Sequence, residues 1–216
     1  MYLPAHFKED RVPVLKKAIR KIGFGTLVTN EADGIEANHL PMLIHDAPSP
    51  FGTLRGHMAR SNPQWQRVKP GTQALAIFLG PHCYVSPSLY PSKEETGKVV
   101  PTWNYLAVHA AGEISFYDNP LQLKDHIAEL IETHEGPRAN SWSLHDAPPD
   151  YIDKMLRSIV GFNLVVTRFD GKWKMSQNRS AQDIDGVREG LRKEGGRAQA
   201  AVAAAMDEIY RPKDAN

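Results

Sequence analysis

Short strand-like segments separated by turn signals dominate this chain of 216 residues. We count about eight such segments, most of them joined by connections of hairpin length. A clear pair is residues 23–30 and 35–44, which flank the hairpin signal Asp33-Gly34. Strands and helices do not alternate regularly, as a doubly wound parallel sheet requires. The sequence therefore predicts a mainly β chain with added helices (α+β) that forms an antiparallel barrel.

Proline and glycine punctuate the remaining segments. Pro41 falls within a strand pattern, which predicts an edge or a bulge there. Gly80-Pro81 predicts a break between strands at 72–80 and 82–87, and Asp170-Gly171 predicts a hairpin between 160–170 and 172–177. Helical spacing of apolar residues, with caps or proline at several starts, predicts helices at about 10–22, 120–136, 148–159 and 179–210. A short helical piece is predicted to begin at Pro63, with Ser61 or Asn62 as its cap.

Charge and cysteine content exclude several classes of function. Lys plus Arg (26) nearly balances Asp plus Glu (25), so no global field draws the chain to nucleic acid or anionic lipid. The best basic run, residues 16–21, lies on one short helix and is typical of a solvated face. No helix-turn-helix or basic stripe supports direct DNA binding. The single Cys83 excludes an internal disulfide, and no signal segment or membrane span is present, so we expect a cytoplasmic protein.

The most unusual segment is residues 99–112, VVPTWNYLAVHAAG. Trp103 and Tyr105 alternate with Asn104 and Leu106 as in a strand with two different faces. A buried Asn must find partners for its donors and its acceptor, and a planar ligand with polar edges would supply them. A well-packed barrel strand with a satisfied Asn is the alternative, and this segment alone does not decide between the two.

Two polar clusters are candidates for holding an anion. Arg60, Ser61 and Asn62 lie at the entrance of a predicted helical turn, where a guanidinium, a hydroxyl and backbone N–H groups converge. The alternative is an ordinary connection with a solvated Arg. The second cluster, residues 174–179, offers Gln177 and Asn178 to a heterocycle edge and Arg179 to a phosphate or carbonyl. Its alternative is a capping turn before the last helices.

Several other chemistries lack their sequence signals. There is no phosphate-binding loop of the Walker type, no GxSxG, no HExxH and no third glycine after Gly23-Phe24-Gly25 for a dinucleotide fingerprint. Histidine is common, and we expect four of the nine to lie on strands. Their spacing matches no recognised ligand interval, so a satisfied barrel histidine is favoured over metal or heme. The four are His39, His57, His82 and His109.

Six blocks of the sequence, in order, carry a family resemblance. They resemble the PaiB-like FMN-binding negative transcriptional regulators, and the likeness runs from Met1 to about Arg179. That family is similar to the flavin split barrels of the pyridoxamine-phosphate-oxidase kind, whose homodimers hold FMN in two clefts at the subunit interface. The blocks are MYLPAHF (1–7), NHLPMLI (38–44), GHMARSNPQW (56–65), FLGPHCYVSPSLY (78–90), VPTWNYLAVHAAG (100–112) and KMSQNR (174–179).

The resemblance implies a fold, a cofactor and a set of contacts. It implies an antiparallel split β-barrel over residues 1–179, with a helical tail over 180–216, and a homodimer that binds FMN. By this resemblance Arg60, Ser61 and Asn62 hold the phosphate. The remaining implied flavin contacts are Asn38, His39, Leu40, His57, Trp103, Asn104, Tyr105, Gln177, Asn178 and Arg179, some of them from the partner chain.

The resemblance and the residues together predict an FMN-binding homodimer that regulates transcription negatively, by a route that can be indirect. Two other classes stay open. A flavin-dependent oxidoreductase or a heme-handling enzyme of the same fold is the first, and an interaction module without flavin is the second. The sequence predicts neither turnover of the flavin nor a substrate.

Overall fold

The computed structural model of the chain describes residues 1–31 and 34–210. The Asp33 part of the predicted hairpin turn lies outside the described residues. Contacts divide the chain into two compact units, which we describe separately. The division expected from the sequence, at residue 179, rests on the extent of the family resemblance and not on contacts, and it stays a prediction. Unit 1 comprises Met1–Ala18, Leu79–Val108 and Asp170–Asn216, and unit 2 comprises Ile19–Phe78 and His109–Phe169.

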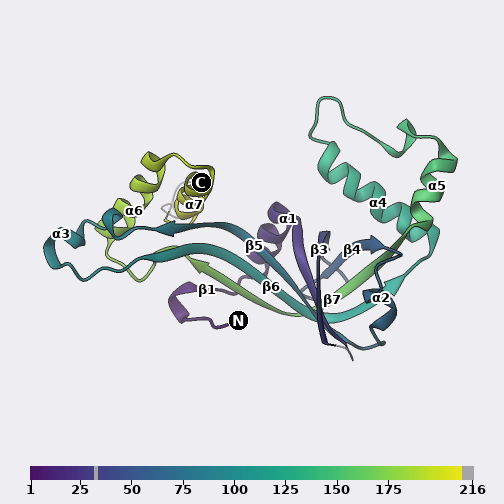
Figure 1. The fold of residues 1–216 in the computed structure, drawn as a ribbon, viewed down its shortest axis with the longest axis horizontal. Coiled ribbons are helices and arrows are strands. Elements are labelled where there is room, and N and C mark those ends of the chain that lie inside the picture. Colours follow the sequence, from purple (N-terminus) through teal and green to yellow (C-terminus); the bar gives the residue numbers. More distant parts are fainter. Residues whose placement is uncertain (32–33, 211–216) are drawn as a thin grey trace. The chain divides into compact units, whose positions relative to one another are not determined.

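Seven strands in the described residues belong to one sheet with the order β1-β7-β4-β3-β2-β5-β6 (Figure 1). An additional pairing joins β6, at one end of this order, to β7, which stands next to β1 at the other end, and so closes the strands from β7 to β6 into a barrel. This arrangement, with its added helices, confirms the predicted α+β fold built on an antiparallel split barrel. The strands are β1 (Lys8–Glu9), β2 (Phe24–Glu31), β3 (Gly34–His45), β4 (Thr53–Ala59), β5 (Gln73–Val85), β6 (Thr102–Tyr117) and β7 (Ile159–Lys174).

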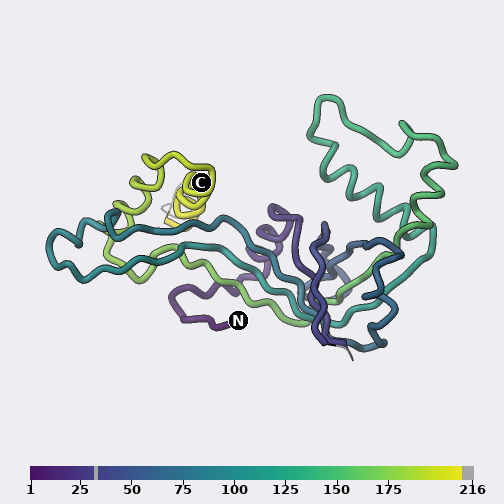
Figure 2. The backbone as a smooth tube through the Cα atoms, viewed as in Figure 1, coloured from purple at the N-terminus to yellow at the C-terminus, as the bar shows by residue number. Residues whose placement is uncertain are grey.

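Unit 2 is built on antiparallel ladders between neighbouring strands. β2 pairs along its whole length with β3, from Phe24 opposite Pro41 to Glu31 opposite Gly34, and the two strands run side by side in Figure 2. β3 pairs with β4, β4 with β7, and β2 with β5. Burial alternates along β2, as expected for a strand with one face on a core. The fully buried apolar side chains of the unit include Leu27, Met42, Leu54, Met58, Phe78, Phe162 and Leu164.

Pro41 lies where one ladder of β3 is about to begin. The pairing of β3 with β4 starts at Met42, directly after the proline. Pro41 has no N–H to donate. Because the β3–β4 ladder begins only after Pro41, no N–H group of this residue is required on the side that faces β4. The proline is thus accommodated at the end of the β3–β4 ladder in a strand that has neighbours on both sides.

Gly112 allows β6 to pass very close to β7 within unit 2. A Cβ at this position would collide with the backbone carbonyl of Val165 and lie 2.9 Å from Cα of Val166. Only glycine permits this approach without a shift of the backbone. The glycine that ends the VPTWNYLAVHAAG block therefore has a packing role.

The helices of unit 2 lie outside its strands. α2 (Gln64–Arg67) follows β4, while α4 (Pro120–Glu135) and α5 (Pro149–Arg157) pack against each other (Figure 1). Asn119 accepts hydrogen bonds from Leu121 N and Gln122 N, with Pro120 in the first turn, and Gly136 ends the helix. This confirms the start and end predicted for α4. A short 3-10 helix, η3 (Leu144–Asp146), lies in the loop between α4 and α5.

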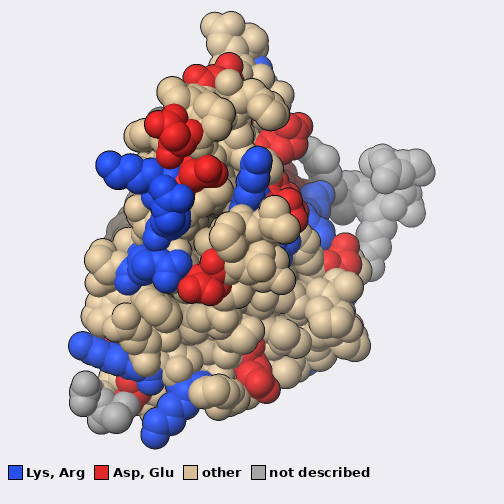
Figure 3. Space-filling view, turned by 90° about the vertical axis from the view of Figure 1, so that its right-hand side faces the viewer, with Lys and Arg blue, Asp and Glu red and all other residues tan. Residues whose placement is uncertain are grey.

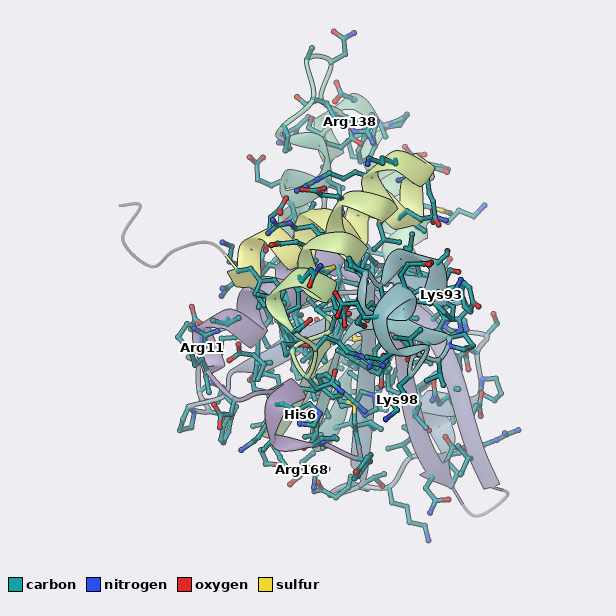
Figure 4. All side chains as sticks on the ribbon, turned by 90° about the vertical axis from the view of Figure 1, so that its left-hand side faces the viewer. His6, Arg11, Lys93, Lys98, Arg138 and Arg168 are labelled. Atoms are coloured by element: carbon teal, nitrogen blue, oxygen red, sulfur yellow. The ribbon has the colours of Figure 1, made fainter. Side chains whose placement is uncertain are left out.

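Unit 1 has a core of its own around the C-terminal helices α6 (Ala181–Glu194) and α7 (Arg197–Tyr210). These helices confirm the helical prediction for residues 179–210. The N-terminal segment of unit 1 contains η1 (Ala5–Phe7), with His6, and Arg11 just before α1 (Val12–Ile22), whose residues from Ile19 on belong to unit 2. Lys93 of unit 1 belongs to α3 (Ser92–Thr96) (Figure 4). The last short element is η2 (Pro87–Leu89). The buried core residues are Cys83, Val85, Tyr90, Met175, Val187, Leu191, Val202, Ala203 and Met206.

The break predicted at Gly80-Pro81 is wrong, because β5 is one continuous strand. Buried positions fall on Ala74, Ala76 and Phe78 before this dipeptide and on Cys83 and Val85 after it. The alternation therefore changes phase at Gly80-Pro81, as it does at a β-bulge. The turn signal marks an irregularity within a strand.

The hairpin predicted at Asp170-Gly171 is also wrong, because β7 runs without interruption through both residues. Gly171 lies opposite Glu9 of β1, and a Cβ on it would collide with a side-chain methyl group of Leu15. The glycine is needed for close packing of β1 and α1 on β7 in unit 1. Glycine in a strand interior often has this meaning, and the turn rule does not distinguish the two uses.

Candidate functional site

The NHL segment of β3 presents its side chains to both faces of the strand. His39 is exposed, contacts Thr26 Oγ1 through Nδ1 at 2.9 Å and stacks near Phe24. Asn38 and Leu40 are half-buried and point to the opposite face, as alternation requires. A ligand on one face of β3 therefore meets either His39 or the Asn38 and Leu40 pair.

Asn38 is connected to α2 by a buried polar network. Its Nδ2 donates to Oε1 of Gln64 at 2.9 Å, and Nε2 of Gln64 donates to Oγ1 of Thr29 at 2.9 Å. Gln64 is fully buried and Thr29 nearly so. The network joins the NHL block to the block that contains Arg60, Ser61 and Asn62, and it orients the Asn38 amide.

Arg60 is held by the backbone that follows α5. Its Nε donates to the Arg157 carbonyl at 2.8 Å, its Nη2 donates to the Ile159 carbonyl at 3.2 Å, and its Nη1 lies 3.4 Å from Oδ2 of Asp118. The indole of Trp65 donates to the Arg60 carbonyl at 3.0 Å, and the guanidinium lies over the same ring. Nη1 and Nη2 each keep a further N–H, so the side chain is pre-oriented and retains donors.

A pocket of about 270 Å³ opens beside Arg60 in unit 2. Two basic residues, Arg60 and Arg157, and two acidic residues, Asp118 and Asp153, lie in its lining. A phosphate here would meet donors of both arginines and also the repulsion of the carboxylates. The pocket is therefore less positive than the Arg60 segment alone predicts.

Ser61 and Asn62 belong to the turn between β4 and α2. Ser61 is exposed, and Oδ1 of Asn62 accepts a hydrogen bond from the Gln64 N–H at 3.0 Å. This hydrogen bond satisfies one N–H group of the first turn, although the N-cap position of α2 is Pro63 and not Asn62. Because α2 has four residues, its dipole adds little to anion binding, so the side chains and the turn N–H groups carry that role.

His57 points to the face of β4 that α4 covers. Its Nδ1 lies 3.2 Å from Nε2 of His126, which is fully buried. Burial lowers the pKa of His57; burial, together with the positive charges of His57, Arg55 and His45, lowers the pKa of His126 to about 3. The two rings are therefore neutral near pH 7 and share one hydrogen bond.

The Trp103 segment of β6 lies in unit 1 and is partly exposed. The Trp103 ring lies 6.4 Å from the ring of His82 and 6.2 Å from that of Tyr84, measured between centroids. We call these three residues the aromatic cluster. Trp103 is 53% exposed and Tyr84 47%, which is unusual for side chains of this size.

Asn104 is buried and finds its partners within unit 1. Its Nδ2 donates to Oγ of Ser176 at 3.1 Å, and Oγ of Ser176 donates to Oδ1 of Asn104 at 3.4 Å. Ser176 has a positive φ of 68°, a backbone conformation that is uncommon outside glycine. Both polar atoms of the Asn104 amide thus contact Ser176, which precedes Gln177, Asn178 and Arg179, and Nδ2 also lies 3.9 Å from Sδ of Met206.

Gln177, Asn178 and Arg179, the three predicted site residues of this turn, have different surroundings. Gln177 is tied to the backbone, since its Oε1 accepts from Met175 N at 2.7 Å and its Nε2 donates to the Trp173 carbonyl. Asn178 is exposed. The Arg179 guanidinium lies 5.0 Å from the centroid of the Tyr90 ring.

Two lysines lie beside this turn: Lys174, which belongs to the predicted 174–179 cluster but was given no role, and Lys172, which sequence reasoning missed. Nζ of Lys172 donates to the Tyr2 carbonyl and lies 5.5 Å from the ring centroids of both Tyr2 and Tyr105. Nζ of Lys174 donates at 2.6 Å to Oγ1 of Thr102 and to the Trp103 carbonyl. Their spacing of two along a predicted strand, 172–177, was the available signal that they share a face.

These lysines make unit 1 locally positive. Burial lowers the pKa of Lys174, and the charges of Lys172 and Arg179 lower it further. Within residues 1–31 and 34–210, none of these three cations has a carboxylate ion-pair partner. An anionic group near them would relieve that repulsion.

His39, His57, His82 and His109 all lie on strands, as predicted. In the part of the chain that the structure describes, no three His, Cys, Asp or Glu side chains are arranged to hold a metal ion. Among the same residues, no helix has the length and apolar character needed to cross a membrane.

Comparison with known families is decisive for the relationship of this chain. Residues 1–168 match the family described as "Putative FMN-binding domain". The chain belongs to this FMN-binding family. It is also 34% identical to the protease synthase and sporulation protein PAI 2 of Bacillus subtilis, over 90% of each chain. The PaiB-like resemblance seen in the sequence blocks is thereby confirmed, and FMN is the cofactor of the family.

Other relatives and solved structures agree on the fold of this FMN-binding family member. An uncharacterized Aspergillus fumigatus protein is 32% identical over 99% of both chains. The Azotobacter vinelandii flavocytochrome Anf3 is 6% identical with a TM-score of 0.61, covering 85% of this chain and 78% of its own. The FAD and heme binding protein of Mycobacterium smegmatis is 11% identical with a TM-score of 0.56, covering 88% and 80%. At these identities the two structures support the split-barrel fold alone.

Proposed function

We propose that the protein acts as an FMN-binding homodimer that lowers transcription indirectly, without reading DNA itself. The observation that carries the proposal is the similarity to PAI 2 over nine-tenths of both chains, together with the FMN-binding family match. The name of that relative refers to protease synthesis and sporulation. A flavin, when bound, supplies hydride or one-electron chemistry, and the residues of the chain bind and orient it.

The donor set of unit 2 fits a flavin phosphate. Such a group carries close to two negative charges and needs donors already aimed at it. Arg60 is fixed by two backbone carbonyls and keeps further N–H groups, and exposed Ser61 lies beside it. We therefore assign the phosphate to Arg60, Ser61 and Asn62, with Asn38, His39, Leu40 and His57 as further contacts.

The residues of unit 1 form a second proposed set of flavin contacts. Trp103 offers an exposed ring, Tyr105 lies beside Lys172, and Arg179 is a cation without a carboxylate partner among the described residues. Asn104 and Gln177 hold the backbone of this region in position through their internal hydrogen bonds. Exposed Asn178 completes the set.

The homodimer is supported by the aromatic cluster of unit 1. Exposed rings of this kind on a strand pair are typical of surfaces that another chain covers. A second copy is the partner that is always present at equal concentration, and twofold symmetry lets one patch meet itself.

An indirect regulatory route is supported by the charge distribution. In the basic run of α1, Lys16 is buried and Arg20 pairs with Asp46 at 3.3 Å. On the face drawn in Figure 3, Lys and Arg side chains lie beside Asp and Glu. Duplex DNA binding by the purified protein should be weak and strongly salt-dependent. Sequence-specific nanomolar binding near physiological salt, measured by fluorescence anisotropy, would refute the indirect route.

The test of the whole proposal begins with the purified full-length chain. We expect an absorbance band at about 450 nm, as bound flavin gives, and release of FMN upon denaturation. Colourless protein that takes up no added FMN would overturn the cofactor assignment for this chain.

The second candidate function is a flavin-dependent oxidoreductase or heme-handling enzyme. It is favoured by the flavin and heme named for the two solved structures of the same fold. Anaerobic addition of NADH or NADPH distinguishes the two candidates. Bleaching of the flavin band at catalytic rates would favour the enzyme, while an unreactive flavin supports the regulatory proposal.

A further inference from the structure

A second pocket in unit 2, of about 250 Å³, lies apart from the Arg60 lining already described except for the shared Leu156. Its walls come from β4, β7, α4, η3 with the loop before it, and α5. We call it the α4–α5 pocket. Its volume is just below the range of about 300–1,000 Å³ typical of drug-sized ligands, which suits a molecule with a single ring. Its lining residues are His57, Ile127, Trp142, Leu144, Tyr151, Ile152, Met155, Leu156 and Ile159.

Large apolar side chains around this pocket stay exposed to solvent. Trp142 is 42% exposed, Tyr151 53% and Met155 38%, although the chain has a well-formed core elsewhere. Single exposed apolar residues are ordinary, but a group of them around one concavity marks a binding site. Two of the three are aromatic, which favours a planar partner.

His57 supplies an oriented polar group from the strand side of the pocket. Its Nδ1 contacts Nε2 of His126 at 3.2 Å, which fixes the ring. Nε2 of His57 has no hydrogen-bond partner among the described residues and is not among their fully buried atoms. Because His57 lines the pocket, this nitrogen is the one available to a ligand.

The chemistry of this nitrogen determines which ligands fit. Burial lowers the pKa of both histidines, so the pair carries no charge near pH 7. Nε2 of His57 is a donor if His126 donates to Nδ1, and an acceptor in the reverse arrangement. A hydroxyl group satisfies either arrangement. A carboxylate would lose its hydration among apolar walls without gaining a cation.

We propose that the α4–α5 pocket binds a small uncharged aromatic molecule with one hydroxyl group, which pairs with Nε2 of His57. The ring packs between Trp142, Met155 and the aliphatic residues of α4 and α5. The proposal does not depend on the flavin. Because Nδ1 of His57 contacts His126 and Nε2 is assigned to this pocket, His57 would contact FMN through its backbone, so FMN and the phenol are expected to bind independently.

Calorimetric titration of the full-length protein with 4-ethylphenol tests the proposal. We expect saturable binding with one site per chain. Ethylbenzene, which lacks the hydroxyl, should bind about two- to tenfold more weakly, the range of one net hydrogen bond. The anion 4-ethylbenzoate should give no saturable heat. No saturable heat with 4-ethylphenol would overturn the proposal, and equal affinity for ethylbenzene would overturn the role of His57.

A pair of matched variants ties binding to this pocket. Met155→Glu places a charge at the rim, on a side chain exposed enough to tolerate it, and should weaken 4-ethylphenol binding at least about tenfold. Leu121→Glu changes a side chain on α4 that is 73% exposed and lies outside the lining, and should leave binding unchanged. Equal effects of both variants, or no effect of either, would contradict the assignment.

A competition experiment separates this pocket from the flavin site. Protein saturated with FMN should bind 4-ethylphenol with unchanged affinity. Displacement of 4-ethylphenol by FMN would show that the probe occupies the flavin site and would overturn the proposal of a separate pocket. Failure to bind FMN at all would refute the proposed cofactor while leaving the phenol titration of the pocket valid.

Discussion

Asn38 on β3 and Gln64 on α2 are joined by a hydrogen bond of 2.9 Å between Nδ2 of Asn38 and Oε1 of Gln64. Gln64 is fully buried and also donates to Thr29, so one side chain holds two strands and a helical turn in register. A buried polar group of this kind is stabilising only while all its partners are present. The link also fixes the start of the segment that follows Arg60, Ser61 and Asn62.

Gln64→Leu should lower the free energy of unfolding by about 1–3 kcal/mol, because the amide of Asn38 and the hydroxyl of Thr29 lose a buried partner. Urea unfolding measures the change. Gln66→Leu, at an exposed position of the same helix, is the control and should change stability by less than about 0.5 kcal/mol. A Gln64 variant as stable as the control would mean that the network contributes nothing.

The parts of this fold that were predictable depend on local signals. The Asn119-Pro120 start and Gly136 end of α4 act within one turn of helix, and the resemblance blocks identified the barrel. The errors at Gly80-Pro81 and Asp170-Gly171 have one cause. Glycine is suited both to a turn and to a position where another segment packs closely against the backbone. Which of the two applies depends on the residue that packs there, such as Leu15 against Gly171.

Local patterns nominated the residues of the candidate site, which stay a prediction, but gave no information on their contacts. The hydrogen-bond partner of Asn104 is Ser176, which is 72 residues away in the sequence. No local sequence pattern predicts such a pair. His126 lies on a helix with ordinary spacing, and its importance comes from His57 on another element. Tertiary partners of this kind are set by the packing of the whole unit.

Arg60→Ala should weaken FMN binding about ten- to a hundredfold and leave riboflavin binding nearly unchanged, because riboflavin has no phosphate. Trp103→Ala should weaken both, since ring packing does not depend on the phosphate. Titration of both flavins against both variants decides. Equal loss of FMN and riboflavin in the Arg60 variant would mean that the phosphate binds elsewhere.

Arg60 also bonds to the carbonyls of Arg157 and Ile159, so its removal has a structural cost. Thermal unfolding of the flavin-free Arg60 variant serves as the control for that cost. A variant that loses FMN only because it unfolds would lose riboflavin equally and would also melt at a lower temperature. Equal loss therefore means that the phosphate binds elsewhere only when the melting temperature is unchanged.

Tyr84→Asp should shift the protein from dimer to monomer, because a charge in the aromatic cluster would be buried at the proposed interface. Sedimentation velocity at micromolar concentration measures the change. Ile35→Asp is the control, since Ile35 is 77% exposed and lies in unit 2, outside the cluster. A wild-type protein that is already a stable, folded monomer would refute the homodimer.

The histidine pair should make stability pH-dependent. The pKa of His126 is lowered to about 3 by burial and by the positive charges of His57, Arg55 and His45. In the unfolded chain a histidine titrates near pH 6.5. Between that pH and about pH 3, His126 therefore binds a proton in the unfolded state but not in the folded state. The free energy of unfolding should therefore be highest above pH 6.5 and fall on acidification towards pH 3.

His126→Gln isolates this contribution. Each proton bound only by the unfolded state lowers stability by at most about 1.4 kcal/mol per pH unit, and the burial of His57 adds in the same direction. Urea unfolding from pH 7 to 5, above the range where most carboxylates titrate, should show a clearly smaller pH slope for His126→Gln than for the wild type. His39→Gln, at an exposed position of β3, should keep the wild-type slope. Equal slopes for wild type and His126→Gln would mean that the folded protein accommodates a protonated His126 near pH 5, by opening the contact between α4 and β4.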